Sequence, residues 1–77
     1  MTDRLIALFA EELDVEPASL NDESSPDSVE SWDSLAAMRL VAAIESEFNI
    51  RLSARDAMRM KTIGIARSVL KAKAVDL

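Results

Sequence analysis

Residues 32–48 read WDSLAAMRLVAAIESEF and decide the fold of this chain. After an acidic turn, the apolar residues recur at the spacing of one face of an α-helix. This stripe consists of Ala37, Leu40, Val41, Ile44 and Phe48. Leu35 and Met38 lie off the stripe, near the start of the helix. We therefore predict a helix that begins at Ser34 or Leu35, ends near Phe48 and buries one continuous side.

Upstream of this stretch, a second helical pattern leads to Leu13. Thr2 is a candidate N-cap, because a threonine hydroxyl can accept a hydrogen bond from a backbone N–H in the first turn. The apolar positions that follow have the spacing of one helix face: Leu5, Leu8, Phe9 and Leu13, with Ile6 at the edge. We predict a first helix from Thr2 to about Leu13.

The segment between the two helices, residues 14–33, has no periodicity and is rich in Asp, Asn, Ser and Glu. Pro17 and Pro26 disfavour a continuous helix. A connection of this length is long for a compact domain, and such loops are usually functional or disordered. We predict an ordered loop because three apolar residues can anchor it on the core: Val15, Leu20 and Val29.

Downstream, two further helix starts are visible. Ser53 and Asp56 resemble a capping box, which predicts a short third helix through about Met60. Thr62 can cap a last helix from Ile63 to about Lys73, although Gly64 weakens its first turn. The residues that this last helix is expected to bury are Ile63, Ala66, Val69 and Leu70.

These elements predict an all-α fold, a four-helix bundle with a long loop between helices 1 and 2 and a short third helix. We expect one domain spanning residues 1–77, because the chain is too short for two. The bundle pattern fits many small α-domains, so function has to be argued from a site.

Composition excludes several kinds of chemistry. The chain has no cysteine and no histidine, which removes disulfides, thiolate nucleophiles and the usual general base. No apolar run is long enough to span a bilayer, and the N-terminus lacks the basic start of a signal peptide. A surface that binds nucleic acid often combines basic residues with aromatic ones. The basic half of this chain has no aromatic residues between its basic ones after Phe48. We expect a cytoplasmic monomer with no transmembrane segment and no nucleic-acid partner.

The charges are distributed unevenly along the chain, whose formal net charge is −5. Residues 1–33 hold ten acidic side chains and one basic one, whereas residues 34–77 hold eight basic and four acidic ones. Oppositely charged elements could pack side by side, or an acidic rim could steer basic partners towards Ser34. The sequence supports both interpretations.

Ser34 is the residue to which the site argument leads. A helix start leaves backbone N–H groups unpaired and is the positive end of the helix dipole, so a phosphate ester on Ser34 would be favoured there. Asp33 can act as the N-cap or as an acidic contact for a partner, and Leu35 and Met38 can present apolar surface. Alternatively, Asp33 and Ser34 are only capping residues and Leu35 and Met38 belong to the core.

A family resemblance favours the functional interpretation. Asp33-Ser34-Leu35, followed by Val41-Ala42-Ala43-Ile44-Glu45-Ser46-Glu47-Phe48, resembles the second helix of acyl carrier proteins. The first helix, the long acidic loop with its proline and the Thr62-Ile63 start of the last helix also match the plan of that family. The resemblance covers nearly the whole chain.

The resemblance implies that Ser34 accepts a 4′-phosphopantetheine arm from coenzyme A. Asp33 and Leu35 would be motif neighbours recognised by a phosphopantetheinyl transferase. The protein itself would not be an enzyme and would have no catalytic residues. The thiol of the arm would hold acyl intermediates as thioesters for acyl-transferring and synthase enzymes of fatty-acid, polyketide or related specialised biosynthesis.

The chain departs from the family pattern at Trp32, at Ala36 and Arg39, and at Gly64 near the start of the last helix. Trp32 stands where many relatives carry a small residue, and it is either a loop anchor or a contact for the arm or a partner. Arg39 lies where carriers of bacterial fatty-acid synthesis tend to be acidic, and Ala36 lacks charge. The expected partner-recognition residues are Trp32, Met38 and Arg39. Together these departures point to a specialised, stand-alone carrier rather than the housekeeping one.

Other functions remain open from the residues alone. An aminoacyl or peptidyl carrier would use Ser34 in the same way. An unmodified helical adaptor for protein–protein interaction is the alternative of another class. A hydrolase is disfavoured because Ser34 has no histidine to activate it. A calcium site on Asp22, Glu23 and Asp27 is disfavoured by their spacing, so we expect no metal.

Overall fold

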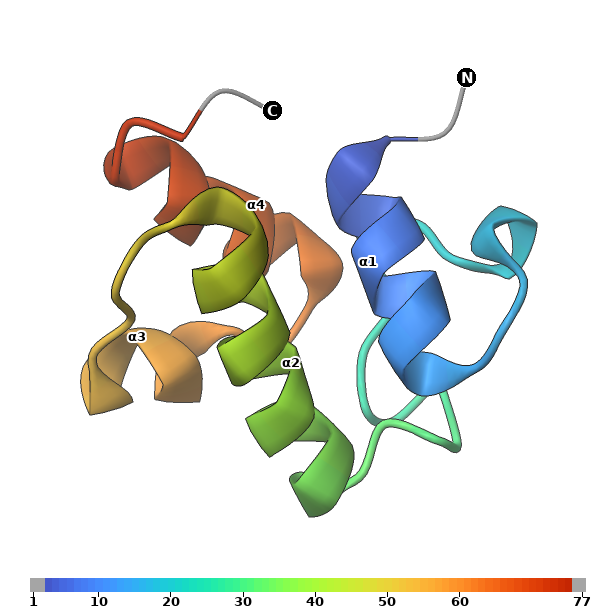
Figure 1. Ribbon diagram of the computed structural model, residues 1–77. Coiled ribbons are helices and arrows are strands. Elements are labelled where there is room, and N and C mark those ends of the chain that lie inside the picture. The colour runs from blue at the N-terminus through green and yellow to red at the C-terminus, as the bar shows by residue number, and fades with distance from the viewer. Residues whose placement is uncertain (1–2, 76–77) are drawn as a thin grey trace.

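A computed structural model describes residues 3–75 and confirms the all-α prediction (Figure 1). The elements are α1 (Arg4–Leu13), the 3₁₀-helix η1 (Pro17–Ser19), α2 (Ser34–Phe48), α3 (Ala54–Arg59) and α4 (Ile63–Ala72). These described residues contain no strand. In Figure 1, α2 lies in the middle of the view between α1 and α3. No helix within residues 3–75 has the length and apolar character needed to cross a membrane.

The core forms where α1 packs against α2 and α4. Leu40 and Ile44 of α2 are buried as predicted, and all four residues predicted for α4 are buried. The predicted stripe on α2 is wrong by one position at its start, because Ala36 is fully buried while Ala37 is half-buried. Val41 and Phe48 are also half-buried. At its start, the buried side of α2 is thus shifted from Ala37 to Ala36 relative to the sequence prediction.

Helix starts follow local capping chemistry. The N-cap of α1 is Asp3, whose carboxylate accepts the Leu5 N–H at 2.8 Å, and not Thr2, which lies outside the described residues. The capping box of Ser53 and Asp56 forms as predicted at the start of α3. The Thr62 hydroxyl caps α4 by accepting the Ile65 N–H at 3.0 Å. Each cap pairs a backbone donor that would otherwise have no partner in its helix.

The loop between α1 and α2 is held on the bundle by apolar and polar contacts. Leu20 is buried, and Val15 and Val29 pack against the core, as predicted. Two backbone hydrogen bonds join the loop to the start of α4: the Ile63 N–H donates to the Ser24 carbonyl at 3.2 Å, and the Gly64 N–H to the Asp22 carbonyl at 2.8 Å. The loop is therefore an ordered part of the fold.

Gly64 is explained by this close approach. A Cβ atom at this position would lie 3.0 Å from the carbonyl oxygen of Asp22 and 3.2 Å from its Cβ. The first contact is with backbone that already accepts the Gly64 N–H, so relieving it requires the loop to move. The glycine that lowers helix propensity in the first turn of α4 is thus what allows the loop to dock there.

We expect Gly64→Ala to lower the free energy of unfolding by about 1–2 kcal/mol. The overpacking cost of about 1–3 kcal/mol exceeds the gain in helix propensity, which is about 1 kcal/mol at most in a first turn. Urea denaturation followed by circular dichroism measures the difference. Ser68→Ala, at an exposed position of the same helix, is the matched control and should be neutral or slightly stabilising. A Gly64→Ala protein more stable than wild type would contradict the close-approach account.

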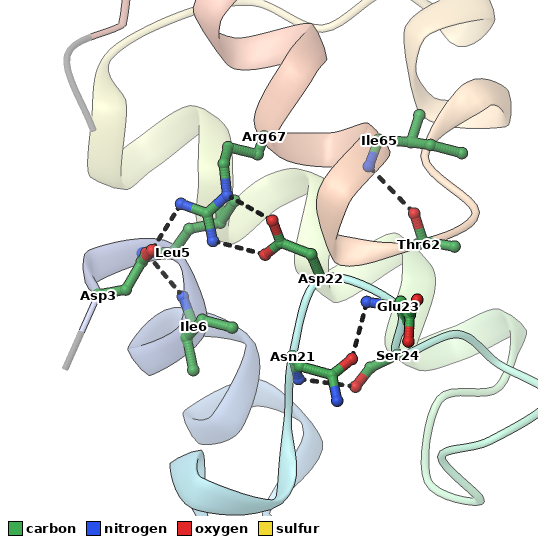
Figure 2. Close-up of polar contacts among 10 residues, drawn as sticks. All are labelled: Asp3, Leu5, Ile6, Asn21, Asp22, Glu23, Ser24, Thr62, Ile65 and Arg67. Atoms are coloured by element: carbon green, nitrogen blue, oxygen red, sulfur yellow. Dashed lines mark hydrogen bonds and ion pairs between the residues drawn. The ribbon is translucent and has the colours of Figure 1, made fainter.

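An ion-pair cluster centred on Arg67 joins α1, the loop and α4 (Figure 2). The Arg67 guanidinium donates to both carboxylate oxygens of Asp22, at 2.9 and 3.3 Å, and also pairs with Asp3. The hydrogen bonds from Arg67 to Asp22 raise the pKa of Arg67, and partial burial lowers it. The contact with Asp3 raises it further, so the pKa of Arg67 lies above its usual value. Partial burial alone would raise the pKa of Asp3. Hydrogen bonds from the Leu5 N–H, Arg67 and the Ile6 N–H outweigh burial, so the pKa of Asp3 lies below its usual value.

We expect Asp3→Asn to lower the free energy of unfolding by about 0.5 kcal/mol at about pH 7 and to have a smaller effect at about pH 2. Asparagine is an equally good N-cap, so the variant isolates the charge beside Arg67. Because the folded-state pKa of Asp3 is below 3.8, its charge stabilises the fold above that pH. The contribution is lost as the pH falls through the folded-state pKa.

Urea denaturation at the two pH values measures this difference. Asp27→Asn, which removes an exposed loop carboxylate, should change stability little at either pH. A destabilisation by Asp3→Asn that is equally large at both pH values would contradict the assignment to the charge.

Candidate functional site

Ser34 is the first residue of α2 and is exposed. Figure 1 shows that the loop enters α2 at one end of the bundle. The side chain of Asp33 caps this helix by accepting the Ala36 N–H at 2.8 Å. The capping role considered for Asp33 is therefore present. Ser34 is thus presented to solvent at the positive end of a fifteen-residue helix.

The three residues before Ser34 fix its position. The Ser31 hydroxyl donates to the Leu13 carbonyl at the end of α1, at 2.7 Å. The Trp32 N–H donates to the Val29 carbonyl at 3.0 Å. The Trp32 ring packs edge-on against Phe9, with ring centroids 5.3 Å apart. The backbone before Ser34 is therefore held against α1, and the backbone after it is held by the cap of α2.

Trp32 is a loop anchor, which is the first of the two roles considered for it. Its side chain is only 4% exposed and belongs to the core. Because so little of Trp32 is exposed, a partner approaching from outside would touch almost none of it, and direct partner recognition by Trp32 stays a prediction. Ala36, which was noted for its lack of charge, is fully buried and therefore does not form part of the surface near Ser34.

Leu35 and Met38, in contrast, lie outside the core. Their exposed fractions are 67% and 70%, which contradicts the alternative that they are core residues. Met58 of α3 is 76% exposed. Large apolar side chains are seldom left this open in clusters unless something binds to them.

An apolar groove opens between α2 and α3, one turn from Ser34. Its volume is about 190 Å³, and Met38 and Met58 both line it. The remaining lining residues are Phe9, Trp32, Ala37, Leu40, Val41, Ala57 and Met60. All nine lining residues are apolar, so the groove suits a hydrocarbon rather than a charged group.

The charged residues of α2 are separated along the helix. Arg39 is exposed in the first half, where no described acid lies within 4 Å of it. In the second half, Glu45 accepts the Leu52 N–H at 2.8 Å and Glu47 pairs with Arg4 at 3.2 Å. The surface near Ser34 on this helix is therefore apolar and basic.

The chemistry available at Ser34 is that of an acceptor. The sequence has no histidine or cysteine to act as a base or a second nucleophile. Residues 3–75 include no group of three or more acidic side chains placed to hold a metal ion. Of the loop acids considered for a metal, Asp22 is already paired with Arg67. Modification by another enzyme is the role that this serine can fill without an internal base.

The α3 side of the groove was missed in the sequence. Ala57, Met58 and Met60 were not identified as site residues, because a six-residue helix is too short to show which face it presents. The methionine content of this segment was the only signal, since methionine is common on adaptable apolar surfaces.

Comparison with known proteins gives two findings. Residues 3–64 match the family model described as a phosphopantetheine attachment site, and this range includes Ser34. The fold is similar to a holo acyl carrier protein from Geobacter metallireducens, solved by NMR in solution, with a TM-score of 0.83 and 25% sequence identity. The match covers 95% of this chain and 84% of that protein.

Proposed function

Because the chain belongs to the phosphopantetheine attachment family, we propose that Ser34 is the residue to which its 4′-phosphopantetheine arm is attached. The observation that carries this proposal is the exposed Ser34 hydroxyl at the capped start of α2, inside the matched range. Asp33 and Leu35 are its motif neighbours. The family and the fold make the chain a carrier protein of the acyl carrier type, which is not an enzyme.

The residues around Ser34 fit such an arm. A phosphodiester on Ser34 would sit at the positive end of α2, where anions are stabilised. Leu35 and Met38 are exposed beside it and offer apolar contact to the chain of the arm. Ser34 itself is exposed, so a transferase can reach its hydroxyl.

The chain's own residues act by positioning. When bound, the arm supplies a terminal thiol that can hold an acyl group as a thioester. Asp33 keeps the first turn of α2 formed, and Trp32 fixes the loop so that Ser34 faces outward. The apolar groove beside Met38 offers shelter to an apolar acyl chain. Delivery then depends on partners that dock near Ser34.

We further propose that the cargo consists of acyl intermediates of fatty-acid, polyketide or related specialised biosynthesis. The groove supports an acyl cargo, because its apolar lining offers no partner to the charged amine of an aminoacyl group. An aminoacyl or peptidyl carrier is the alternative within the same class. The arm itself would come from coenzyme A through a phosphopantetheinyl transferase.

Loading assays distinguish these cargos. The holo protein is incubated with fatty-acyl-activating or aminoacyl-activating enzymes, and the added mass is measured before and after hydroxylamine, which cleaves thioesters. Acyl loading that hydroxylamine removes supports the proposal. Efficient loading by the aminoacyl enzyme alone would favour the alternative. A chain that no transferase modifies would instead be an unmodified adaptor.

A further inference from the structure

We propose that the phosphopantetheinyl transferase of this chain docks on a face of α2 and α3 that is apolar and basic, and that it therefore presents carboxylates around an apolar socket. This docking face consists of Leu35, Met38, Arg39, Arg55, Met58 and Arg59. The inference rests on the proposed function, because it identifies the chemistry of the partner that must reach Ser34.

The size of a specific protein–protein interface indicates how far the contact of the transferase extends from Ser34. A transferase that places its active centre at Ser34 covers about 800 Å² of the carrier. The whole chain exposes 5136 Å², so such an interface extends well beyond one residue. Leu35 is adjacent to Ser34, and Met38 and Arg39 lie one turn further along α2. A partner whose interface extends from Ser34 along α2 therefore covers these residues.

The apolar part of the face is unusually open. Leu35, Met38 and Met58 are three of the four large apolar side chains that are exposed in the described residues. Met38 and Met58 line the same groove from opposite helices, so α2 and α3 contribute to one continuous surface. An apolar side chain of a partner that covers them would stabilise the complex, because apolar surface is removed from water.

The docking face is positively charged because its arginines form no ion pairs within the described residues. Arg39, Arg55 and Arg59 are exposed, and none is within 4 Å of an acid in the described residues. The acids of the two helices are engaged elsewhere: Glu45 with the Leu52 N–H, Glu47 with Arg4, and Asp56 with Lys73 and the α3 cap.

The acid next to Ser34 along the chain is Asp33, whose carboxylate caps α2. Covering an arginine without an opposite charge is costly, so a partner that buries this face has to supply carboxylates.

The test is the rate of coenzyme A-dependent modification by the phosphopantetheinyl transferase of the source organism. We compare kcat/KM for the wild-type chain, Arg39→Gln, Arg39→Glu and the double variant Arg39→Glu/Arg59→Glu. The matched control is Arg51→Glu, which makes the same charge change at an exposed site beyond the far end of α2. All substituted positions are exposed, and circular dichroism checks that each variant is folded.

We expect Arg39→Glu to lower kcat/KM by about 3–10-fold, mainly through KM, and Arg39→Gln by less. The double variant should lose about 10–50-fold, while Arg51→Glu should stay within about 2-fold of wild type. Added salt should slow modification of the wild-type chain and affect Arg39→Glu less.

Three results would overturn the inference while leaving Ser34 as the attachment site: faster or unchanged modification of Arg39→Glu, an equal loss in Arg51→Glu, or a wild-type dimer that Arg39→Glu dissociates. The last result would mean that the face pairs two copies of the chain. A wild-type chain that the transferase does not modify would overturn the proposed function itself, and the inference with it.

Discussion

A Trp32→Ala variant should lose about 3–5 kcal/mol of unfolding free energy, the largest stability effect that we expect from a single substitution. The Trp32 side chain is 4% exposed and packs on Phe9, so its removal leaves a cavity at the junction of the loop and α1. A core in a domain of this size supplies only about 3–5 kcal/mol in total. The variant should therefore be largely unfolded at room temperature, as circular dichroism would show.

A matched variant separates this account from the alternative of partner contact. Trp32→Phe keeps an aromatic ring against Phe9 and should retain most of the stability and the normal rate of modification at Ser34. If Trp32 instead contacted partners directly, Trp32→Ala would remain folded and be modified slowly. A folded Trp32→Ala protein with wild-type unfolding free energy would contradict the anchor role.

Ser34→Ala should abolish addition of phosphopantetheine while leaving the fold intact. In the proposed role the Ser34 hydroxyl is the acceptor, and alanine offers no atom to which the phosphate can be attached. Ser34 is exposed, and Asp33 rather than Ser34 caps α2, so stability should change by less than about 0.5 kcal/mol. Intact mass after incubation with coenzyme A and a phosphopantetheinyl transferase measures the addition.

Ser46→Ala is the control for this experiment. Ser46 is also exposed and lies on α2, but in its second half, away from the capped start. It should be modified like the wild-type chain. Equal addition to Ser34→Ala and to wild type would mean that another side chain accepts the arm.

The bounds of the helices could be predicted because they depend on residues that are close in sequence. The N-caps at Ser53 and Thr62 hydrogen-bond with residues three positions away, so their chemistry is visible in a short window. The same holds for the start of α2, where Asp33 accepts the Ala36 N–H. Ser34 was predicted at this start for the same reason.

The features that sequence analysis missed depend on contacts between distant parts of the chain. Ala36 is buried more deeply than Ala37, and this depends on how α2 packs against the other helices. Arg67 pairs with Asp22 across 45 positions, and no local pattern indicates it.

Gly64 shows the same limit most clearly. Its cost to helix propensity is visible in the sequence, but the loop carbonyl that requires a glycine there is visible only in the fold.

The candidate site also has one part that is visible in the sequence and one part that depends on the fold. The proposed attachment motif is local, so Asp33, Ser34 and Leu35 could be singled out together from the sequence. The groove needs α3 to lie beside α2, and the exposed Met58 becomes informative only once it is seen opposite Met38. Arg39 was noticed as a departure in charge. Its lack of a described acid within 4 Å, which supports a partner with carboxylates, required the structure.

The most direct test of the central claim is to map the modified residue in the wild-type chain. The protein is incubated with coenzyme A and a phosphopantetheinyl transferase, digested, and analysed by tandem mass spectrometry. We predict a single phosphopantetheine per chain, on the peptide that contains Ser34 and on that side chain. A chain that remains unmodified, or that carries the group on a different residue, would contradict the account.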